Sequence, residues 1–159
     1  MIIAKGKSDE AVSISKFEDY ESLDTSIGTE KAVSFLHQHL EQYGDSKDSI
    51  RRAIDYAFSQ EEGKGGFLLV ATKRGELAGV VVMNDTGMKG YIPEHILVYI
   101  AVERKTRGTG IGRRLLKRVK ELCTGDIALH VEENNPARFL YRRLGFKTKY
   151  REMRLVRSR

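Results

Sequence analysis

Three glycines at alternating positions stand between an apolar segment and a basic amphipathic one, within the run Arg107-Gly108-Thr109-Gly110-Ile111-Gly112. The first turn of a helix has unpaired N–H groups and a partial positive charge. Glycines at that point leave room for a phosphate to approach the backbone closely. We therefore expect the amides of residues 108–113 to hold a phosphate or pyrophosphate, with Arg107, Arg113 and Arg114 adding charge. Tight packing of the helix on the preceding strand is the other use of such glycines.

Two common phosphate-binding motifs are absent from the chain. The dinucleotide motif G-x-G-x-x-G would need glycine at position 113, which is arginine. The motif G-x-x-x-x-G-K-[ST] does not occur either, because Gly6-Lys7-Ser8 lacks the upstream glycine. Both of these nucleotide-site classes are excluded.

The elements that must position the glycine run follow from the hydrophobic pattern. Residues 96–102 form a β-branched and aromatic run, typical of a strand buried on both faces. Residues 110–123 repeat apolar side chains at helical spacing, with most cations off that stripe. Further strands are predicted at 11–17, 67–72, 77–83, 127–131 and from residue 146 onward. Further helices are predicted at 29–43, 46–60 and 135–144.

The composition is that of a globular protein, with 40% hydrophobic and 31% charged residues in a chain of 159. This length suits one domain, 1–159, with its own core. The longest apolar stretch has seven residues, whereas a membrane-spanning helix needs ~20, and the first residues do not resemble a signal peptide. The single Cys123 suits a reducing cytoplasm. Because no HExxH spacing occurs, we expect no metal site. From the apolar stretches, the first residues and the single cysteine, we expect no membrane association and a cytoplasmic location.

Charge is distributed unevenly along the chain. Residues 1–103 hold 11 Lys and Arg against 17 Asp and Glu, a net of −6. Residues 104–159 hold 17 against 5, a net of +12. Such asymmetry indicates an anionic partner for the second half, either a nucleic acid, a membrane surface or a phosphate-bearing cofactor. Solvated helix faces and a basic tail are the simpler explanation.

A second motif begins 27 residues after Arg107 and reads Asn134-Asn135-Pro136-Ala137-Arg138-Phe139-Leu140-Tyr141-Arg142-Arg143-Leu144-Gly145-Phe146. It is similar to the N-x-x-A-x-x-x-Y-x-x-x-G-F element of the GNAT N-acetyltransferases. The glycine run, which follows Ile100-Ala101-Val102, resembles their acetyl-CoA signature [RQ]-x-x-G-x-[GA]. The predicted strand 127–131 lies between the two motifs, as the family requires. The resemblance covers residues 66–150.

The resemblance implies an α+β fold with a mixed central sheet of about six or seven strands, a splayed central strand pair and about four flanking helices. Residues 1–65 would form the variable acceptor side. Residues 66–159 would form the acetyl-CoA-binding core and a C-terminal strand. The activity implied is transfer of an acetyl group from acetyl-CoA to a primary amine, by direct attack in a ternary complex.

The resemblance also implies how acetyl-CoA is held. The glycine run would bind its pyrophosphate, and the central strand would pair with its pantetheine arm. The backbone N–H near Ile100 would polarise the thioester carbonyl. Asn134 would contact the cofactor or cap the following helix. The cofactor-binding residues implied are Ile100, Ala101, Val102, Arg107, Gly108, Thr109, Gly110, Ile111, Gly112, Arg113, Asn134 and Tyr141.

Tyr141 matches the family residue that gives a proton to the leaving CoA thiolate. A phenol with its usual pKa of ~10 is protonated at neutral pH and is able to donate. A core tyrosine that only positions the sulfur is the alternative. The acceptor ammonium must lose a proton before it attacks, and Glu94 and His95 are the candidate bases, with Glu132 and Glu133 as a second choice. The alternative is that these carboxylates are ordinary solvated side chains at strand ends.

Two other functions compete with acetyl transfer. A GNAT-like module that binds CoA without turnover would keep the same loop. A nucleic-acid-binding module would use the cations after residue 103, but the basic helix 110–123 has no interleaved aromatic residues and no nucleic-acid-binding signature occurs. The partners expected are acetyl-CoA and an amine acceptor, either a small molecule or a protein amine. No nucleic acid is expected, and the family allows a homodimer.

Overall fold

Within residues 12–158, which the computed structural model describes, five strands form one mixed sheet in the order β1-β2-β3-β4-β5. The pairs β1–β2, β2–β3 and β3–β4 are antiparallel, and the pair β4–β5 is parallel. The strands are β1 (Val12–Phe17), β2 (Gly66–Lys73), β3 (Glu76–Asp85), β4 (His95–Val102) and β5 (Ile127–Leu129). The helices are α1 (Tyr20–Ser26), α2 (Thr29–Leu40), α3 (Lys47–Ala57), α4 (Ile111–Leu122) and α5 (Ala137–Arg143), with 3-10 turns η1 (Glu41–Tyr43) and η2 (Arg104–Thr106).

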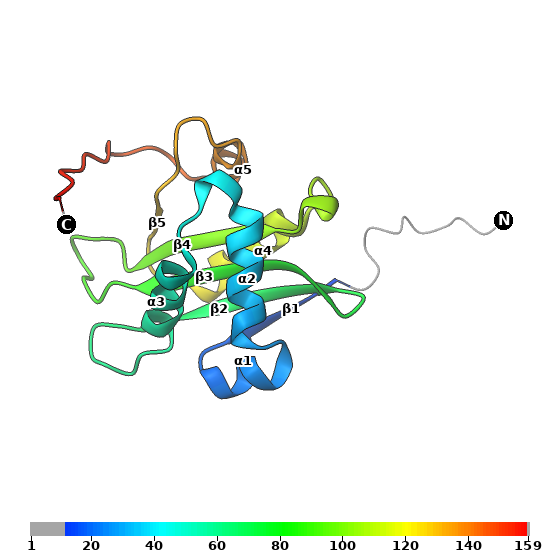
Figure 1. Ribbon diagram of the computed structural model, residues 1–159. Coiled ribbons are helices and arrows are strands. Elements are labelled where there is room, and N and C mark those ends of the chain that lie inside the picture. The colour runs from blue at the N-terminus through cyan, green and yellow to red at the C-terminus, as the bar shows by residue number, and fades with distance from the viewer. Residues whose placement is uncertain (1–11, 159) are drawn as a thin grey trace.

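Helices cover both faces of the sheet, and each face has its own hydrophobic core. Figure 1 shows α2 and α3 in front of the strands and α4 behind them. On one face, Val70, Val80 and Val82 belong to the core with the helices α1 to α3. On the other face, Leu69 and Val81 pack with α4 and α5. The central strands β2 and β3 are therefore buried on both sides, as their continuous apolar runs predict.

The strand β4 carries an irregularity that decides the shape of the site. In the pairing with β3, Val82 lies opposite Tyr99 and Met83 lies opposite Leu97, so Val98 is an extra residue. Such a β-bulge bends a strand and changes the face to which the next side chain points. Leu97 accordingly packs with the α4 core, whereas Tyr99 packs with the α2 and α3 core.

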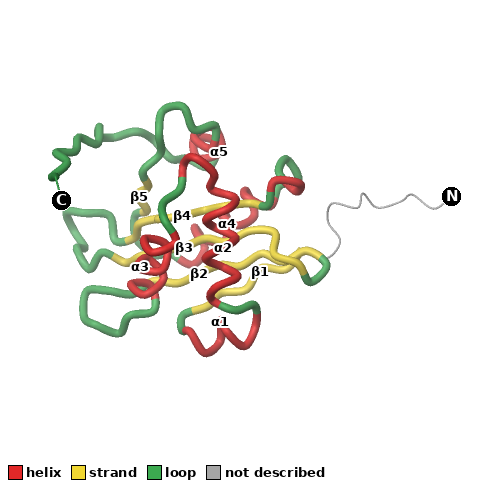
Figure 2. Tube along the Cα trace, viewed as in Figure 1, coloured by secondary structure: helices red, strands yellow, loops and turns green. Residues whose placement is uncertain are grey.

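The parallel pairing of β4 with β5 covers three residue pairs, and Leu97 opposite Leu129 is the last. Beyond that pair, β4 continues for five residues without a partner on its β5 side. The tube trace in Figure 2 shows β5 turning away from β4 toward α5. The splayed strand pair that the family resemblance implies is therefore present between these two strands.

The two helices around the expected site begin and end where the sequence predicts. α4 starts after Gly110, which has a left-handed φ of 90°, and buries Ile111, Leu115, Leu116 and Val119 along its apolar stripe. α5 follows Pro136, whose fixed φ suits a helix start, and is closed by Gly145 with a φ of 99°. Glycine adopts this conformation without the strain of a side chain.

The mixed α+β fold class is confirmed, but the expected six or seven strands are five in the described residues. The strand predicted from residue 146 onward does not form in the described residues. Phe146 packs against the α4 and α5 core, but the segment beyond it pairs with no strand, and its large apolar side chains are exposed. Tyr150, for example, is 77% exposed. The helix α1 was not predicted, because it buries only Leu23 and so shows no apolar periodicity.

None of the helices between residues 12 and 158 has the length and apolar character that crossing a lipid bilayer requires.

The first residue of β2, Gly66, gives a direct test of the sheet geometry. It has a φ of 146°, and a Cβ added there would lie 1.9 Å from the carbonyl oxygen of Met83. We expect Gly66→Ala to lower the free energy of unfolding by about 3 kcal/mol, through backbone strain and this contact. Gly90→Ala is the control, because its φ is 103° but its added Cβ meets nothing within 4 Å. Urea unfolding should give a loss of about 1 kcal/mol for this control, and equal losses would contradict the described pairing.

Candidate functional site

The loop between β4 and α4 presents a set of backbone N–H groups that the protein leaves free. The amides of Thr106, Arg107 and Thr109 donate to carbonyls of η2 and of the residue before it. Five other backbone N–H groups of the loop and the first turn of α4 do not bond to any carbonyl or side chain of residues 12–158. These free amides belong to Gly108, Gly110, Ile111, Gly112 and Arg113. They lie in the loop before a twelve-residue helix and in its first turn, where a negative charge is favoured.

The three glycines of the loop have two different tasks. At Gly108 and Gly110, which have φ values of 80° and 90°, an added Cβ would meet nothing within 4 Å. At Gly112, an added Cβ would lie 3.2 Å from a methyl group of Leu140 and 3.6 Å from one of Val102. Gly108 and Gly110 therefore open the loop to a ligand, while Gly112 lets α4 pack closely on β4 and α5.

The side chain of Arg107 anchors this loop. Its guanidinium donates to the carbonyl oxygen of Val102 at 3.1 Å and to that of His39 at 2.7 Å, and it lies 3.2 Å from the Glu41 carboxylate. Arg104 bonds to the same carboxylate at 2.9 Å. These two arginines, Arg104 first, lower the pKa of Glu41. The guanidinium of Arg107 thus connects the loop to the end of α2, whereas Arg113 is exposed at the start of α4.

The residues Ile100, Ala101 and Val102 lie in the unpaired part of β4. Their other edge is paired with β3, opposite Val81, Val80 and Gly79. On the β5 side, this part of the strand has backbone groups that a peptide-like chain is able to pair with. The free edge leads directly into the glycine loop, so a long ligand with a phosphate tail would contact both.

Tyr141 lies on the inner side of α5, with 8% of its surface exposed. Its ring packs edge-on against Phe146, with the ring centroids 5.9 Å apart. Its hydroxyl has no hydrogen-bond partner among the described residues, and it is not closed off from solvent. Burial raises the pKa of Tyr141 to about 12. The side chain is therefore a phenol that keeps its proton and still has it available for a ligand.

The two adjacent asparagines before α5 have different positions. The Asn135 side chain accepts a hydrogen bond from the Ala137 amide at 2.9 Å, which is the bond of a helix cap. Asn134 is exposed, and its backbone carbonyl accepts a hydrogen bond from the Tyr43 hydroxyl at 3.1 Å. Capping of α5 is thus performed by Asn135, and the Asn134 side chain remains free to contact a ligand.

Glu94 and His95 hold a turn against the start of β4. The Glu94 carboxylate accepts the Asp126 amide at 2.6 Å, and its own amide together with that of Asp126 lowers its pKa. His95 Nδ1 lies 2.8 Å from the Asp85 carboxylate, and His95 Nε2 accepts the Gly125 amide at 3.4 Å. Both ring nitrogens of His95 are therefore engaged. This pair lies at the opposite end of β4 from the glycine loop, before the strands separate.

A carboxylate that the sequence analysis did not select lies beside the splayed part of β4. The Tyr99 hydroxyl donates to Asp45 Oδ2 at 2.5 Å. Tyr99 is the first residue after the bulge, and Asp45 is an exposed residue of the connection between η1 and α3. Burial, followed by this hydrogen bond, raises the pKa of Tyr99. No sequence signal marks the pair, because Asp45 stands in a polar loop and Tyr99 in an apolar strand.

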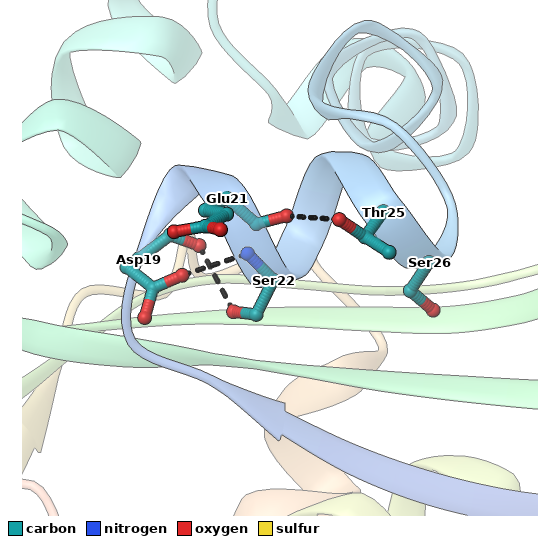
Figure 3. A pocket seen from close by; sticks show the side chains of 5 residues that line it. All are labelled: Asp19, Glu21, Ser22, Thr25 and Ser26. Atoms are coloured by element: carbon teal, nitrogen blue, oxygen red, sulfur yellow. Dashed lines mark hydrogen bonds between the residues drawn. The ribbon is translucent and has the colours of Figure 1, made fainter.

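A shallow depression elsewhere on the surface lacks such chemistry. It is lined by Asp19, Glu21, Ser22, Thr25 and Ser26, whose bonds stay within α1, as Figure 3 shows. The Asp19 carboxylate caps the helix by accepting the Ser22 amide at 2.7 Å. This helix lies next to β1, at the other edge of the sheet from β5. In residues 12–158, no group of three or more His, Cys, Asp or Glu side chains is placed to hold a metal ion.

Comparison with known proteins relates this site to a family. A sequence profile of the acetyltransferase (GNAT) domain matches residues 64–148. The 5-NmdU N-acetyltransferase of Pseudomonas phage PaMx11 is 31% identical over 124 residues, which cover 76% of this chain and 86% of that protein. The residues that match the family profile include the glycine loop and Tyr141.

Solved structures share the fold of the chain. An aminoglycoside N-acetyltransferase in complex with CoA has a TM-score of 0.66 and 16% identity, and the match covers 99% of each chain. The ribosomal-protein-alanine N-acetyltransferase from Brucella melitensis biovar Abortus 2308 has a TM-score of 0.61 and 18% identity, over 93% of this chain and 99% of that one. The protein thus belongs to the GNAT family and is an N-acetyltransferase that takes its acetyl group from acetyl-CoA.

Proposed function

We propose that this enzyme acetylates a primary amine by direct attack on acetyl-CoA bound between β4 and β5. The observation that carries the proposal is the run of five free amides at the open glycine loop, next to the unpaired edge of β4. In this arrangement, residues 107–113 hold the pyrophosphate. The backbone of residues 100–102 pairs with the pantetheine arm, and Asn134 lies at the rim.

The reaction needs three proton movements, and the chain has a group for two of them. The acceptor ammonium loses one proton, and its nitrogen then forms a bond to the acetyl carbon. The nitrogen loses a second proton to solvent as the carbon–sulfur bond breaks and the amide forms. Tyr141 then gives its proton to the CoA thiolate and regains one from solvent. We assign the first deprotonation to the Asp45 carboxylate, which is oriented by Tyr99. Because Glu94 and His95 are engaged in the turn at 125–126, we assign them to positioning of β4 rather than to proton transfer.

The acceptor that we propose is an amine attached to a nucleotide, such as that of 5-NmdU. The support is the 31% identity to an enzyme named for that acceptor. The net charge of +12 in residues 104–159 also favours an acceptor that carries phosphate. Residues 1–65 would form the acceptor side, since they contribute Asp45, and residues 66–159 would hold acetyl-CoA.

The phosphate role of the loop is tested by Gly110→Val. The added side chain would enter the open space in front of the free amides, so we expect binding of acetyl-CoA to weaken by at least tenfold. Gly28→Val is the matched control, because Gly28 has a φ of 91°, against 90° at Gly110, and the same open surroundings. Both variants carry similar backbone strain, of about 1–2 kcal/mol. Calorimetric titration with acetyl-CoA distinguishes them, and normal binding by Gly110→Val would refute the loop assignment.

The acid role of Tyr141 is tested by Tyr141→Phe. We expect kcat to fall by about a hundredfold, the usual contribution of a general acid, while KM for acetyl-CoA changes by less than about threefold. Because burial raises the pKa of Tyr141 to about 12, its proton remains in place as the pH rises past 10. The kcat of the wild type should therefore show no decline between pH 9 and 10.5. An unchanged kcat in the variant would leave Tyr141 as a packing residue.

The role of Asp45 is tested by Asp45→Asn, which keeps the shape but removes the charge. At a pH below the pKa of the acceptor amine, we expect kcat/KM for the amine to fall on the order of tenfold. Above that pKa the amine is already neutral, so the deficit should shrink. Tyr99→Phe should lower kcat/KM less and in the same pH range. A deficit that is constant across pH, measured by thiol release, would assign Asp45 to folding or binding alone.

A further inference from the structure

The exposed side chains of α5 and of the segment that follows it are strongly basic. Residues 137–158 contain eight Lys and Arg and a single acidic residue, Glu152. We call this surface the terminal basic face, and its cations are Arg138, Arg142, Arg143, Lys147, Lys149 and Arg151. In the described residues, none of these six has a carboxylate partner, since the ion pair in this region joins Arg154 to Glu152. The charge of this face is therefore unneutralised by the protein.

Two aromatic rings within residues 137–158 are exposed, and each has a cation beside it. Phe139 is 50% exposed, and the Arg138 guanidinium lies 4.8 Å from its ring centroid. Tyr150 is 77% exposed, and the Lys149 ammonium lies 5.3 Å from its ring centroid. Proteins that bind single-stranded nucleic acids combine these elements, because cations neutralise phosphates and aromatic rings stack on bases.

The position of this face relates it to the reaction. α5 directs Tyr141 inward and Phe139 outward, so one short helix separates the proposed acid from the terminal basic face. Figure 1 shows the segment after α5 passing the β5–α5 connection and arching away from the strands. A polymer bound to α5 and this segment would therefore reach the α5 side of the wedge between β4 and β5.

We infer that the terminal basic face binds the backbone and bases of a single-stranded nucleic acid that carries the acceptor amine. This inference rests on the proposed function for its acceptor. A base must leave its stack before its substituent is able to enter a buried site, and a single strand meets that condition without the cost of opening a duplex. The expectation of no nucleic-acid partner came from α4, which has no aromatic residues, whereas the exposed rings are on the next helix and beyond it.

The experiment compares a polymeric acceptor with a free one. The substrates are a short single-stranded oligonucleotide that contains one 5-NmdU and the free 5-NmdU nucleoside. The variant is Lys147→Glu combined with Lys149→Glu. The matched control is Arg52→Glu combined with Arg74→Glu, which makes the same change of charge at exposed cations of α3 and of the β2–β3 turn that have no ion pair in the described residues. KM is measured for each acceptor and for acetyl-CoA at several salt concentrations.

For the Lys147 and Lys149 variant, we expect KM for the oligonucleotide to rise on the order of tenfold. Its salt dependence should become shallower by about 1.4 in the log–log slope, the value for two phosphate contacts to a single strand. KM for acetyl-CoA and kcat/KM for the free nucleoside should stay within about twofold of the wild type. Tyr150→Ala should also raise KM for the oligonucleotide, and Tyr150→Phe should restore it, because both aromatic rings stack on bases.

Several results would overturn the inference. One is an equal KM for the oligonucleotide in the variant and in the control. Another is a parallel rise of KM for acetyl-CoA, which would assign the face to the phosphates of the cofactor. A third is loss of binding to anionic lipid vesicles with an unchanged KM for the oligonucleotide, which would assign it to a membrane surface.

The inference and the proposed acceptor fail in different ways. If the wild type acetylates 5-NmdU in neither form, the acceptor proposal is wrong. The face is then tested by fluorescence anisotropy with an unmodified single-stranded oligonucleotide. Weaker binding by the variant than by the control would support the face, and equal binding would overturn it.

Discussion

One extra residue in β4 determines how this protein is able to hold a long ligand. Val98 has no counterpart in β3, and the parallel pairing with β5 ends one residue before it. A regular strand would continue to pair, and its backbone groups would then be occupied. Because pairing ends, the last five residues of β4 keep a free edge that leads into the glycine loop. The bulge also turns Tyr99 toward α2 and α3, where its hydroxyl meets Asp45. The free edge and the candidate base thus follow from one irregularity.

The glycine loop needs support, because five unpaired amides do not stabilise one another. Arg107 and Arg104 supply it by bonding to Glu41, at the end of α2, and Arg107 also bonds to two backbone carbonyls. An arginine guanidinium suits this task, since it presents several donors in a fixed plane. The loop is therefore held by side chains on its outer side, while its amides remain available on the inner side. The arginine of the signature, Arg107, thus acts as an anchor of the loop, and its guanidinium is engaged by protein oxygens.

The sequence alone was sufficient for features that depend on local periodicity. The stripe of α4, the glycines before it and the inward direction of Tyr141 on α5 all follow from spacing, and the structure places them accordingly. Features that depend on tertiary packing were not accessible. The bulge at Val98 leaves no mark in an apolar run, and Asp45 meets Tyr99 from 54 residues away. The strand expected from residue 146 failed for a related reason. The segment after Phe146 pairs with no described strand, and strand formation depends on such pairing and packing more than on the sequence of the segment itself.

Ion pairs within the folded chain offset part of its uneven charge. Glu41 of the acidic half pairs with Arg104 and Arg107 of the basic half, and the Glu30–Arg51 pair stays within the first half. One carboxylate thus offsets part of the positive charge near the glycine loop. The cations after residue 137 have one acidic residue among them, and it pairs with Arg154. Positive charge that remains unpaired at one end of the folded chain is unfavourable, because like charges repel. A phosphate-bearing partner at that end would relieve it.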